Sequence, residues 1–131
     1  MAIVIANTGK DATLGYLTNK VTVPENLILR LYTNDIIPSE FDTSATYTEV
    51  GAVAGYTSKT LTGATWVIAG ATASYPSQTW TFIGSVGNIY GYYATRETTG
   101  DLVFAERFSA GPYNVATAGD NISVTVNLEL N

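Results

Sequence analysis

The clearest pattern in the chain is a strict alternation of apolar and polar residues close to its C-terminus. In the segment Asn121–Leu130 every second residue is apolar, and these residues are Ile122, Val124, Val126, Leu128 and Leu130. The residues between them are Asn, Ser, Thr, Asn and Glu. A period of two residues is the period of a β-strand, in which successive side chains point to opposite faces. The segment therefore predicts a half-buried antiparallel strand with water on one side.

A second segment, Asn26–Thr33, alternates differently because both of its faces are mostly apolar. Leucines occupy one face, and Ile28, Arg30 and Tyr32 occupy the other. A strand that is apolar on both sides belongs in the middle of a sheet or against a partner. Arg30 is the exception on its face, so we expect it to be paired with an acid.

Further short apolar runs are separated by turn residues. The predicted strands are Tyr56–Leu61, Trp66–Ala69, Ser77–Ile83, Ile89–Thr95 and Leu102–Phe108. The segment Asn34–Ala45 contains Pro38 and three acids and is predicted to be a loop, as is Gly70–Ala73 with its small residues. Short strands at close spacing are typical of a sandwich or a barrel. We therefore predict an all-β fold, an antiparallel and jelly-roll-like β-sandwich, as a single domain over residues 1–131.

The N-terminal region predicts two elements. The apolar run Ala2–Ala6 is either the first strand or an exposed arm that adds to a neighbouring subunit. A short helix is predicted over Asp11–Asn19, because Leu14 and Leu17 are spaced for one helical face. Asp11 would lie near the helix N-terminus, where a negative charge is favoured.

The turn at Thr99-Gly100 predicts a hairpin between the two neighbouring strands. If Thr98 faces Asp101, then Tyr93 faces Glu106, on the same side as Leu102, Phe104 and Phe108. A carboxylate on an apolar face needs a partner. We therefore predict that Glu106 forms an ion pair with Arg30.

The composition excludes many kinds of catalytic site. The chain has no Cys and no His, so it offers no disulfide, thiolate nucleophile or imidazole base. Its net charge is −5, and its six basic residues are scattered singly, which argues against binding to nucleic acid. No apolar run is long enough to cross a membrane. These features predict a protein that is not an enzyme, has no cofactor, and contacts other proteins.

Acidic residues offer the remaining chemistry. Paired carboxylates for glycoside hydrolysis could come from Asp35, Glu40 and Asp42, or from Glu97 and Asp101. The first three acids could also bind calcium, although their spacing matches no calcium-binding loop. Solvated loop residues are the simpler interpretation of both groups, so no catalytic residue and no metal ligand is predicted.

Aromatic residues offer an interaction surface. The chain has nine Tyr and two Trp, and Tyr90 and Tyr92 share one face of a predicted strand. Tyrosine is favoured at protein interfaces, so these two residues are predicted to contact another subunit. Exposed tyrosines could alternatively stack on sugars.

Several short motifs resemble a group of small proteins carried by tailed bacteriophages. They are Asn26–Asn34 with Pro38, Tyr47-Thr48-Glu49, Lys59-Thr60-Leu61-Thr62, Ser74-Tyr75, Gln78–Phe82, Ile89–Tyr93, Ala105–Phe108 and the terminal strand that begins at Gly119-Asp120. The resemblance covers Leu27 to Asn131. It implies a virion protein, most like a capsid decoration (cement) protein that forms trimers on the outer surface of the head.

The resemblance also implies a partner and a place. The partner would be the major capsid protein, with neither nucleic acid nor membrane involved, and the protein would be made in the host cytoplasm. The segment Met1-Ala2-Ile3-Val4-Ile5 lies outside the resemblance and is predicted to be an arm that contacts a neighbour. A tail or neck component and a carbohydrate-binding surface module are the alternatives.

Overall fold

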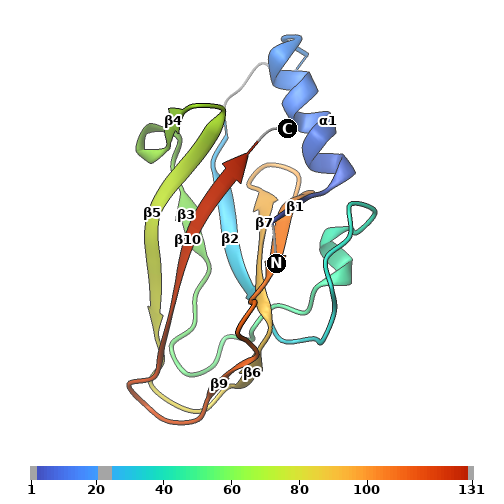
Figure 1. Ribbon diagram of the computed structural model, residues 1–131. Coiled ribbons are helices and arrows are strands. Elements are labelled where there is room, and N and C mark those ends of the chain that lie inside the picture. Colours follow the sequence, from blue (N-terminus) through green and yellow to red (C-terminus); the bar gives the residue numbers. More distant parts are fainter. Residues whose placement is uncertain (1–2, 21–24, 130–131) are drawn as a thin grey trace.

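The chain folds into two antiparallel sheets that pack face to face, with one helix near the N-terminus (Figure 1). The structure is a computed structural model that describes residues 3–20 and 25–129. The elements are β1 (Val4–Ile5), α1 (Asn7–Leu17), β2 (Leu27–Tyr32), β3 (Lys59–Leu61), β4 (Val67–Ala69), β5 (Thr72–Thr81), β6 (Gly87–Ile89), β7 (Gly91–Arg96), β8 (Leu102–Arg107), β9 (Tyr113–Val115) and β10 (Asn121–Glu129). The predicted all-β, sandwich-like fold with a short N-terminal helix is confirmed.

The larger sheet has the order β1-β8-β7-β2-β3, and the smaller one has the order β10-β5-β4. Strands β6 and β9 form a separate pair. The main core lies between the two sheets, where Leu29 and Phe104 of the larger sheet meet Trp80 and Val124 of the smaller one. The alternation predicted for the C-terminal strand is confirmed as far as Glu129, because Ile122, Val124 and Val126 are buried in β10 and the residues between them are exposed. Leu130, the last residue of the predicted strand, lies outside the described residues.

The larger sheet is also buried on its outer face. Here Tyr32, Tyr93 and Leu102 form a second hydrophobic cluster with Tyr47, which lies outside the strands. The prediction that β2 is covered on both sides is therefore confirmed. Strand β7 shows the same property, since its first five residues are all buried.

The β7–β8 hairpin has a register different from the predicted one. Tyr92 faces Glu106 and Ala94 faces Phe104, but Thr95 faces Leu102, so Val103 is an extra residue in a β-bulge. A shift of one residue moves every side chain to the opposite face. The prediction that Tyr93 faces Glu106 is therefore wrong.

The predicted ion pair between Arg30 and Glu106 is wrong for the same reason. Arg30 pairs across the sheet with Tyr93 on the outer face, whereas Glu106 lies on the inner face opposite Tyr92. The Arg30 guanidinium instead contacts the Glu49 carboxylate, with Nη1 and Oε1 2.8 Å apart. Glu106 accepts a hydrogen bond from the Tyr92 hydroxyl at 3.0 Å.

The helix begins four residues before its predicted start and buries a different face. Its buried residues are Gly9 and Ala12, whereas Leu14 and Leu17 are exposed. At Gly9 the helix approaches β8 so closely that a Cβ atom would lie 2.3 Å from the Val103 carbonyl oxygen. The side with the smallest residues therefore faces the sheet, and Asp11 is not in the first turn.

Strand β5 begins at Thr72, whereas the predicted strand in this region began at Ser77. Gly70 and Ala71 both have positive φ, at 59° and 63°, and connect β4 to β5 as a tight two-residue turn. Thr72 and Ala73 are therefore strand residues, and the predicted loop over Gly70–Ala73 is wrong beyond Ala71. The pairing of β5 with β10 has a register shift at Pro76, opposite Thr125. Proline has no N–H group, and a strand tolerates it at such an irregularity.

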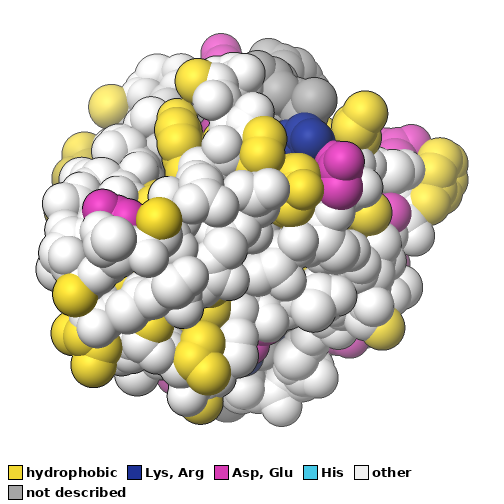
Figure 2. Space-filling view, turned by 90° about the horizontal axis from the view of Figure 1, so that it is seen from below, with side chains coloured by type: hydrophobic (Ala, Val, Ile, Leu, Met, Phe, Trp, Pro, Cys, Tyr) yellow, Lys and Arg dark blue, Asp and Glu magenta, His cyan; other side chains and the backbone are white. Residues whose placement is uncertain are grey.

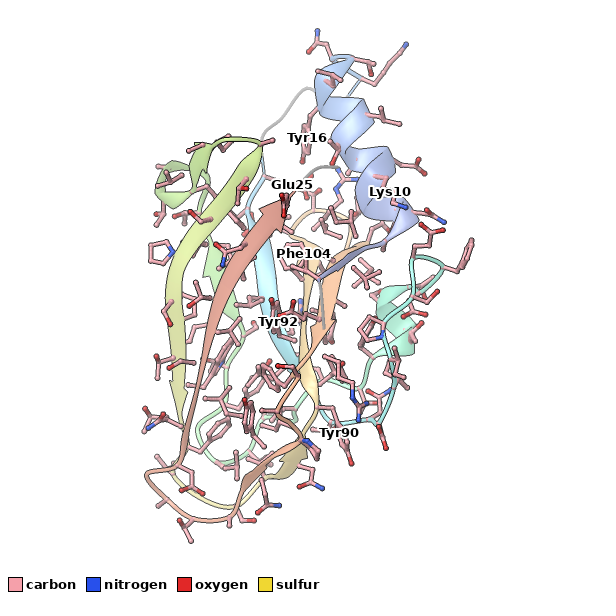
Figure 3. All side chains as sticks on the ribbon, in the orientation of Figure 1. Lys10, Tyr16, Glu25, Tyr90, Tyr92 and Phe104 are labelled. Atoms are coloured by element: carbon pink, nitrogen blue, oxygen red, sulfur yellow. The ribbon has the colours of Figure 1, made fainter. Side chains whose placement is uncertain are left out.

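A buried carboxylate just before β2 connects three parts of the chain. The Glu25 side chain is only 2% exposed, and its Oε2 atom accepts hydrogen bonds from Arg96 Nη2 at 2.7 Å and from Tyr16 at 3.0 Å. Its Oε1 atom accepts from the Thr98 hydroxyl at 2.8 Å. Figure 3 shows Tyr16 and Glu25 close together at one end of the molecule. Burial raises the pKa of Glu25, but the bonds from Arg96 and Thr98 outweigh it and lower this pKa to about 2.

This depressed pKa predicts an acid-sensitive contribution to stability. A group whose pKa falls from 4.5 to about 2 on folding stabilises the protein fully above pH 4.5 and loses that contribution as the pH falls to about 2. We expect Glu25→Gln to lower the free energy of unfolding at pH 7 by about 2–3 kcal/mol. In this variant the free energy of unfolding, measured by urea denaturation, should also fall less steeply between pH 4.5 and 2. Glu97→Gln is the control, because Glu97 is an exposed carboxylate between Arg96 and Thr98 in the sequence. This variant should change neither the free energy of unfolding at pH 7 nor its decline in acid.

Candidate interaction surface

The segment between β2 and β3 begins with a loop over residues 33–48 whose two ends are bonded together. The Thr33 N–H donates to the Thr48 carbonyl at 2.9 Å. The Asn34 amide donates to the Thr46 carbonyl at 2.9 Å and accepts from the Thr48 N–H at 2.8 Å. A loop closed at its base by backbone and side-chain bonds has the form of an Ω-loop. We call this segment the 33–48 loop.

Arg107, at the end of β8, holds the first part of the 33–48 loop. Its guanidinium contacts the Asp35 carboxylate at 2.6 Å and donates to the Ile36 carbonyl at 3.0 Å. The same group lies 5.1 Å from the centre of the Tyr90 ring, which is a cation–π distance. One cation therefore joins the loop to the end of the larger sheet.

Asp42 and Tyr47 hold the second part of the loop. The Asp42 carboxylate accepts hydrogen bonds from the Ser39 N–H and from the Tyr47 hydroxyl, both at 2.8 Å. The Tyr47 ring stacks on Tyr93 of β7, with ring centres 4.9 Å apart, and meets Tyr32 edge-on at 5.0 Å. Burial of the ring and the hydrogen bond to Asp42 both raise the pKa of Tyr47. The loop is thereby fixed to the outer hydrophobic cluster.

The helix supplies the remaining contacts. The Asn7 N–H donates to the Glu40 carbonyl at 2.8 Å. The Lys10 ammonium forms an ion pair with the Glu40 carboxylate. Four elements thus position the loop, namely β2 and β7, the end of β8 and the first turns of α1.

Two large apolar side chains on this well-anchored loop point into solvent. Ile37 is 69% exposed and Phe41 is 78% exposed. Neither contributes to the core, so the folding of this chain gives no reason for apolar residues at these positions. A rigid segment that presents apolar side chains is the arrangement found where partner proteins anchor. The loop predicted for this segment is confirmed, but Ile37 and Phe41 were not among the residues predicted to form an interaction surface.

The predicted N-terminal arm lies partly outside the described residues. Met1 and Ala2 are not described. Val4 and Ile5 form β1 and pair with Ala105 and Phe104 of the same chain, and Ile3 packs against its core. The alternative of a first strand is therefore confirmed for Val4 and Ile5, and the prediction of a free arm is wrong for them. Contact of this edge with a neighbouring subunit stays a prediction.

The two tyrosines predicted at an interface have different surroundings. Tyr92 is 3% exposed and lies in the core between the sheets, near Phe104 (Figure 3). The prediction that it contacts another subunit is wrong, because alternate residues of β7 are buried on both faces. Burial, together with the neighbouring Glu106 carboxylate, raises the pKa of Tyr92. Tyr90 is half-buried beneath Arg107, and its interface role stays a prediction.

The acids considered for catalysis or calcium do not converge. Asp35, Glu40 and Asp42 each have a separate partner, namely Arg107, Lys10 and Tyr47. Within the described residues, no three acidic side chains are placed to share a metal ion. Glu97 accepts from the Asn26 amide at 3.5 Å, while Asp101 lies 3.9 Å from Arg96. The first three acids therefore anchor the 33–48 loop.

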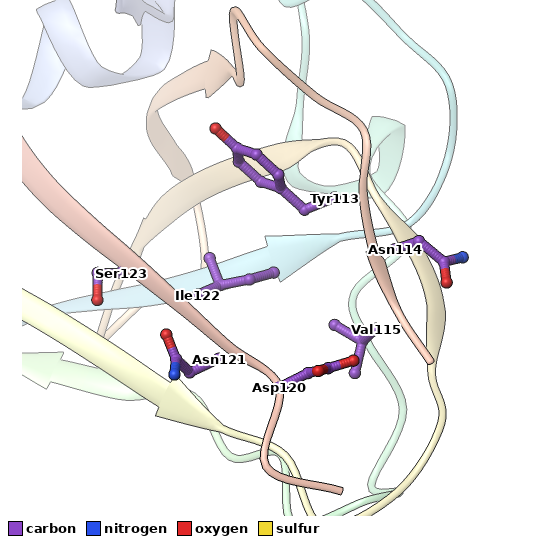
Figure 4. Close-up of a pocket in the computed structure, with 7 residues that line it drawn as sticks. All are labelled: Tyr113, Asn114, Val115, Asp120, Asn121, Ile122 and Ser123. Atoms are coloured by element: carbon purple, nitrogen blue, oxygen red, sulfur yellow. The ribbon is translucent and has the colours of Figure 1, made fainter. Parts of the chain in front are cut away.

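The end of the molecule near β6 and β9 offers a different kind of surface. Figure 2 shows that hydrophobic side chains form small separate groups there and that most of the surface is uncharged. A cavity of about 400 Å³ opens between β9 and the start of β10 (Figure 4). Its lining includes Tyr113, which is 42% exposed, together with Asn121 and Ser123.

Comparison of the chain with known proteins found no relative. No protein-family model, no curated protein and no solved structure matches this chain. In residues 3–20 and 25–129, no helix combines the length and the hydrophobicity required to span a membrane. The candidate surface is therefore defined by its geometry alone.

The anchoring of the 33–48 loop predicts unequal effects of two neighbouring substitutions. Asp42→Ala removes the acceptor for Ser39 and Tyr47, so we expect a loss of about 1–2 kcal/mol in the free energy of unfolding and faster amide exchange at Ser39. Phe41→Ser removes only an exposed side chain and should change stability by less than about 0.5 kcal/mol. Equal losses in the two variants, measured by thermal denaturation, would contradict the proposed anchoring.

Proposed function

We propose that the protein is a structural component of a tailed bacteriophage particle, a decoration (cement) protein on the outer surface of the head. The proposed partner is the major capsid protein, which it would bridge and stabilise. The resemblance in the sequence supports this role. The structural observation that carries it is the well-anchored 33–48 loop, which presents Ile37 and Phe41 to solvent.

Apolar side chains on a fixed loop are suited to binding without chemistry. Transfer of a Phe side chain from water into a partner pocket contributes about 2–3 kcal/mol. A loop that is already ordered loses little conformational freedom on binding, so more of this free energy is retained. Repetition over a symmetric shell then stabilises the whole assembly by mass action.

The charge of the protein supports an outer location. The net charge is −5, and Lys10, Arg30, Arg96 and Arg107 are each paired with an acid of the same chain. Such a surface repels packaged DNA. Three-fold assembly over junctions between capsid subunits is the expected arrangement, and this part of the proposal rests on the sequence resemblance.

A carbohydrate-binding module on the particle surface is the second candidate. The cavity beside β10 combines the half-exposed ring of Tyr113 with Asn121 and Ser123. An aromatic ring with nearby amide and hydroxyl groups is suited to stacking on a sugar and orienting its hydroxyls. Binding to a glycan array that is lost on Tyr113→Ala would favour this function over the first.

The decoration role predicts binding that depends on the tip of the 33–48 loop. Purified protein should cosediment with phage heads assembled without it, at hundreds of copies per particle by quantitative mass spectrometry, as expected for a lattice component. Phe41→Ser should weaken this binding at least about tenfold. The matched control is Leu17→Ser, because Leu17 is similarly exposed at 81% but lies on α1.

Two outcomes would contradict this role. A copy number of about a dozen, the number expected of a ring at a single site, would indicate a tail or neck component instead. Unchanged binding of the Phe41→Ser protein would show that the 33–48 loop is not the contact surface. Because Phe41 is exposed, we expect the Phe41→Ser protein to fold like the wild type. Thermal denaturation of the variant distinguishes a loss of binding from unfolding.

A further inference from the structure

The two main sheets end in four edge strands of very different length. β1 has two residues, while β3 and β4 have three each. β10 has nine residues, and within the described part of the chain it pairs on one side only, with β5. Short edges offer few unpaired backbone groups, whereas a long edge offers a template for another strand. β10 is therefore the edge most able to pair with a further chain.

β10 also lacks the features that usually protect an edge. Between Asn121 and Glu129 there is no Lys, Arg or Pro, and Glu129 at the end is the one charged residue. The irregularity in its pairing lies opposite Thr125, at Pro76-Ser77 of β5, away from the free side. Natural proteins block exposed edges with charges, prolines or bulges. Apart from Glu129 at its end, the described part of β10 has none of these on its free side.

Open space borders both ends of β10. The cavity of about 400 Å³ lies between its first residues and β9, where Asn121 and Ser123 line it (Figure 4). A second cavity, of about 570 Å³, is lined by Glu129 on one side and by Ile3–Ile5 on the other. Neighbouring segments of the chain therefore leave room beside β10.

The residue pattern of β10 is complementary to itself. In an antiparallel pair centred on Thr125, each Ile122 would face Leu128 of the other copy, and each Val124 would face Val126. All four of these side chains point inward and are apolar. On the outer face, Ser123 would face Asn127. Every cross-strand pair thus joins like polarities, as stable sheets require.

The charges fit the same arrangement. Two copies with a net charge of −5 repel one another, so a contact between them must avoid acidic pairs. In the register centred on Thr125, Glu129 of each strand faces Asn121 of the other, and no two carboxylates are opposite. At the centre of the contact the two Thr125 side chains face each other on the outer face, and they are uncharged.

We propose that β10 pairs antiparallel with β10 of a second copy about a two-fold axis at Thr125. The three-stranded sheets of two chains then form one continuous six-stranded sheet. Such an interface is isologous, because the same surface serves both copies. The contact uses no residue of the 33–48 loop and does not depend on the proposed function.

The two-fold axis at Thr125 predicts how charged residues at this position change the pairing of two copies. Sedimentation equilibrium of the wild-type chain should give an even multiple of 13.9 kDa, from paired chains or paired three-fold rings. Thr125→Lys and Thr125→Glu each place like charges opposite one another, so each should weaken the pairing at least about tenfold. An equimolar mixture of the two variants should restore it, because residue 125 then meets an opposite charge. Ser77→Lys, exposed on β5 one strand from the edge, is the control and should pair like the wild type.

A second measurement determines the register. The chain has no Cys, so Thr125→Cys introduces a single thiol that a short bis-maleimide should link to its counterpart at the axis. Ser123→Cys alone should not link, because it faces Asn127, but a mixture with Asn127→Cys should. A wild-type protein that stays monomeric, or an assembly whose mass is unchanged by Thr125→Lys, would overturn the proposal. Binding of Phe41→Ser to heads is measured separately, so failure of one proposal is distinguishable from failure of the other.

Discussion

Burial of β7 on both faces is the constraint on which the rest of the structure depends. Tyr92 points into the core between the sheets, while Tyr93 points outward into the cluster with Tyr32 and Tyr47. The register of β7 and β8 must satisfy both layers at once, and the bulge at Val103 makes this possible. Without it, Leu102 would turn away from the outer cluster, and large side chains on both faces would lose their partners.

The outer layer explains why a long loop can be rigid. Tyr47 belongs to the 33–48 loop by sequence and to the outer cluster by packing, so the loop cannot move without opening part of the core. Arg107 and Glu40 add polar anchors on either side. The contacts that stabilise the fold therefore also fix the loop in the conformation that exposes Ile37 and Phe41 to solvent. This coupling makes the loop a preordered binding element, because ordering is complete before a partner arrives.

The sequence predicted the features that follow from strict periodicity and missed those that depend on close approach. The alternation in β10 and the two-sided burial of β2 were predictable because strand faces repeat every two residues. The bulge at Val103 was not, since one extra residue leaves no mark on the hydrophobic pattern. The helix face was predicted wrongly because Gly9 packs on β8 through its lack of a side chain. In the candidate site, Phe41 was visible as an apolar residue among polar ones, but only the contacts of Asp42 and Tyr47 show that its position is fixed.

The 33–48 loop and the free edge of β10 lie in different layers of the fold, and this separation matters for any role in an assembly. The 33–48 loop packs on the outer face of the larger sheet, whereas β10 is the edge of the smaller sheet. A subunit that used one surface for every contact would form closed pairs and no lattice. With separate surfaces, one contact can bind the shell while the other joins copies, and occupation of the first raises the local concentration available to the second. The edge pairing expected in solution is then strengthened further on a particle, where neighbouring copies are already held at a fixed spacing.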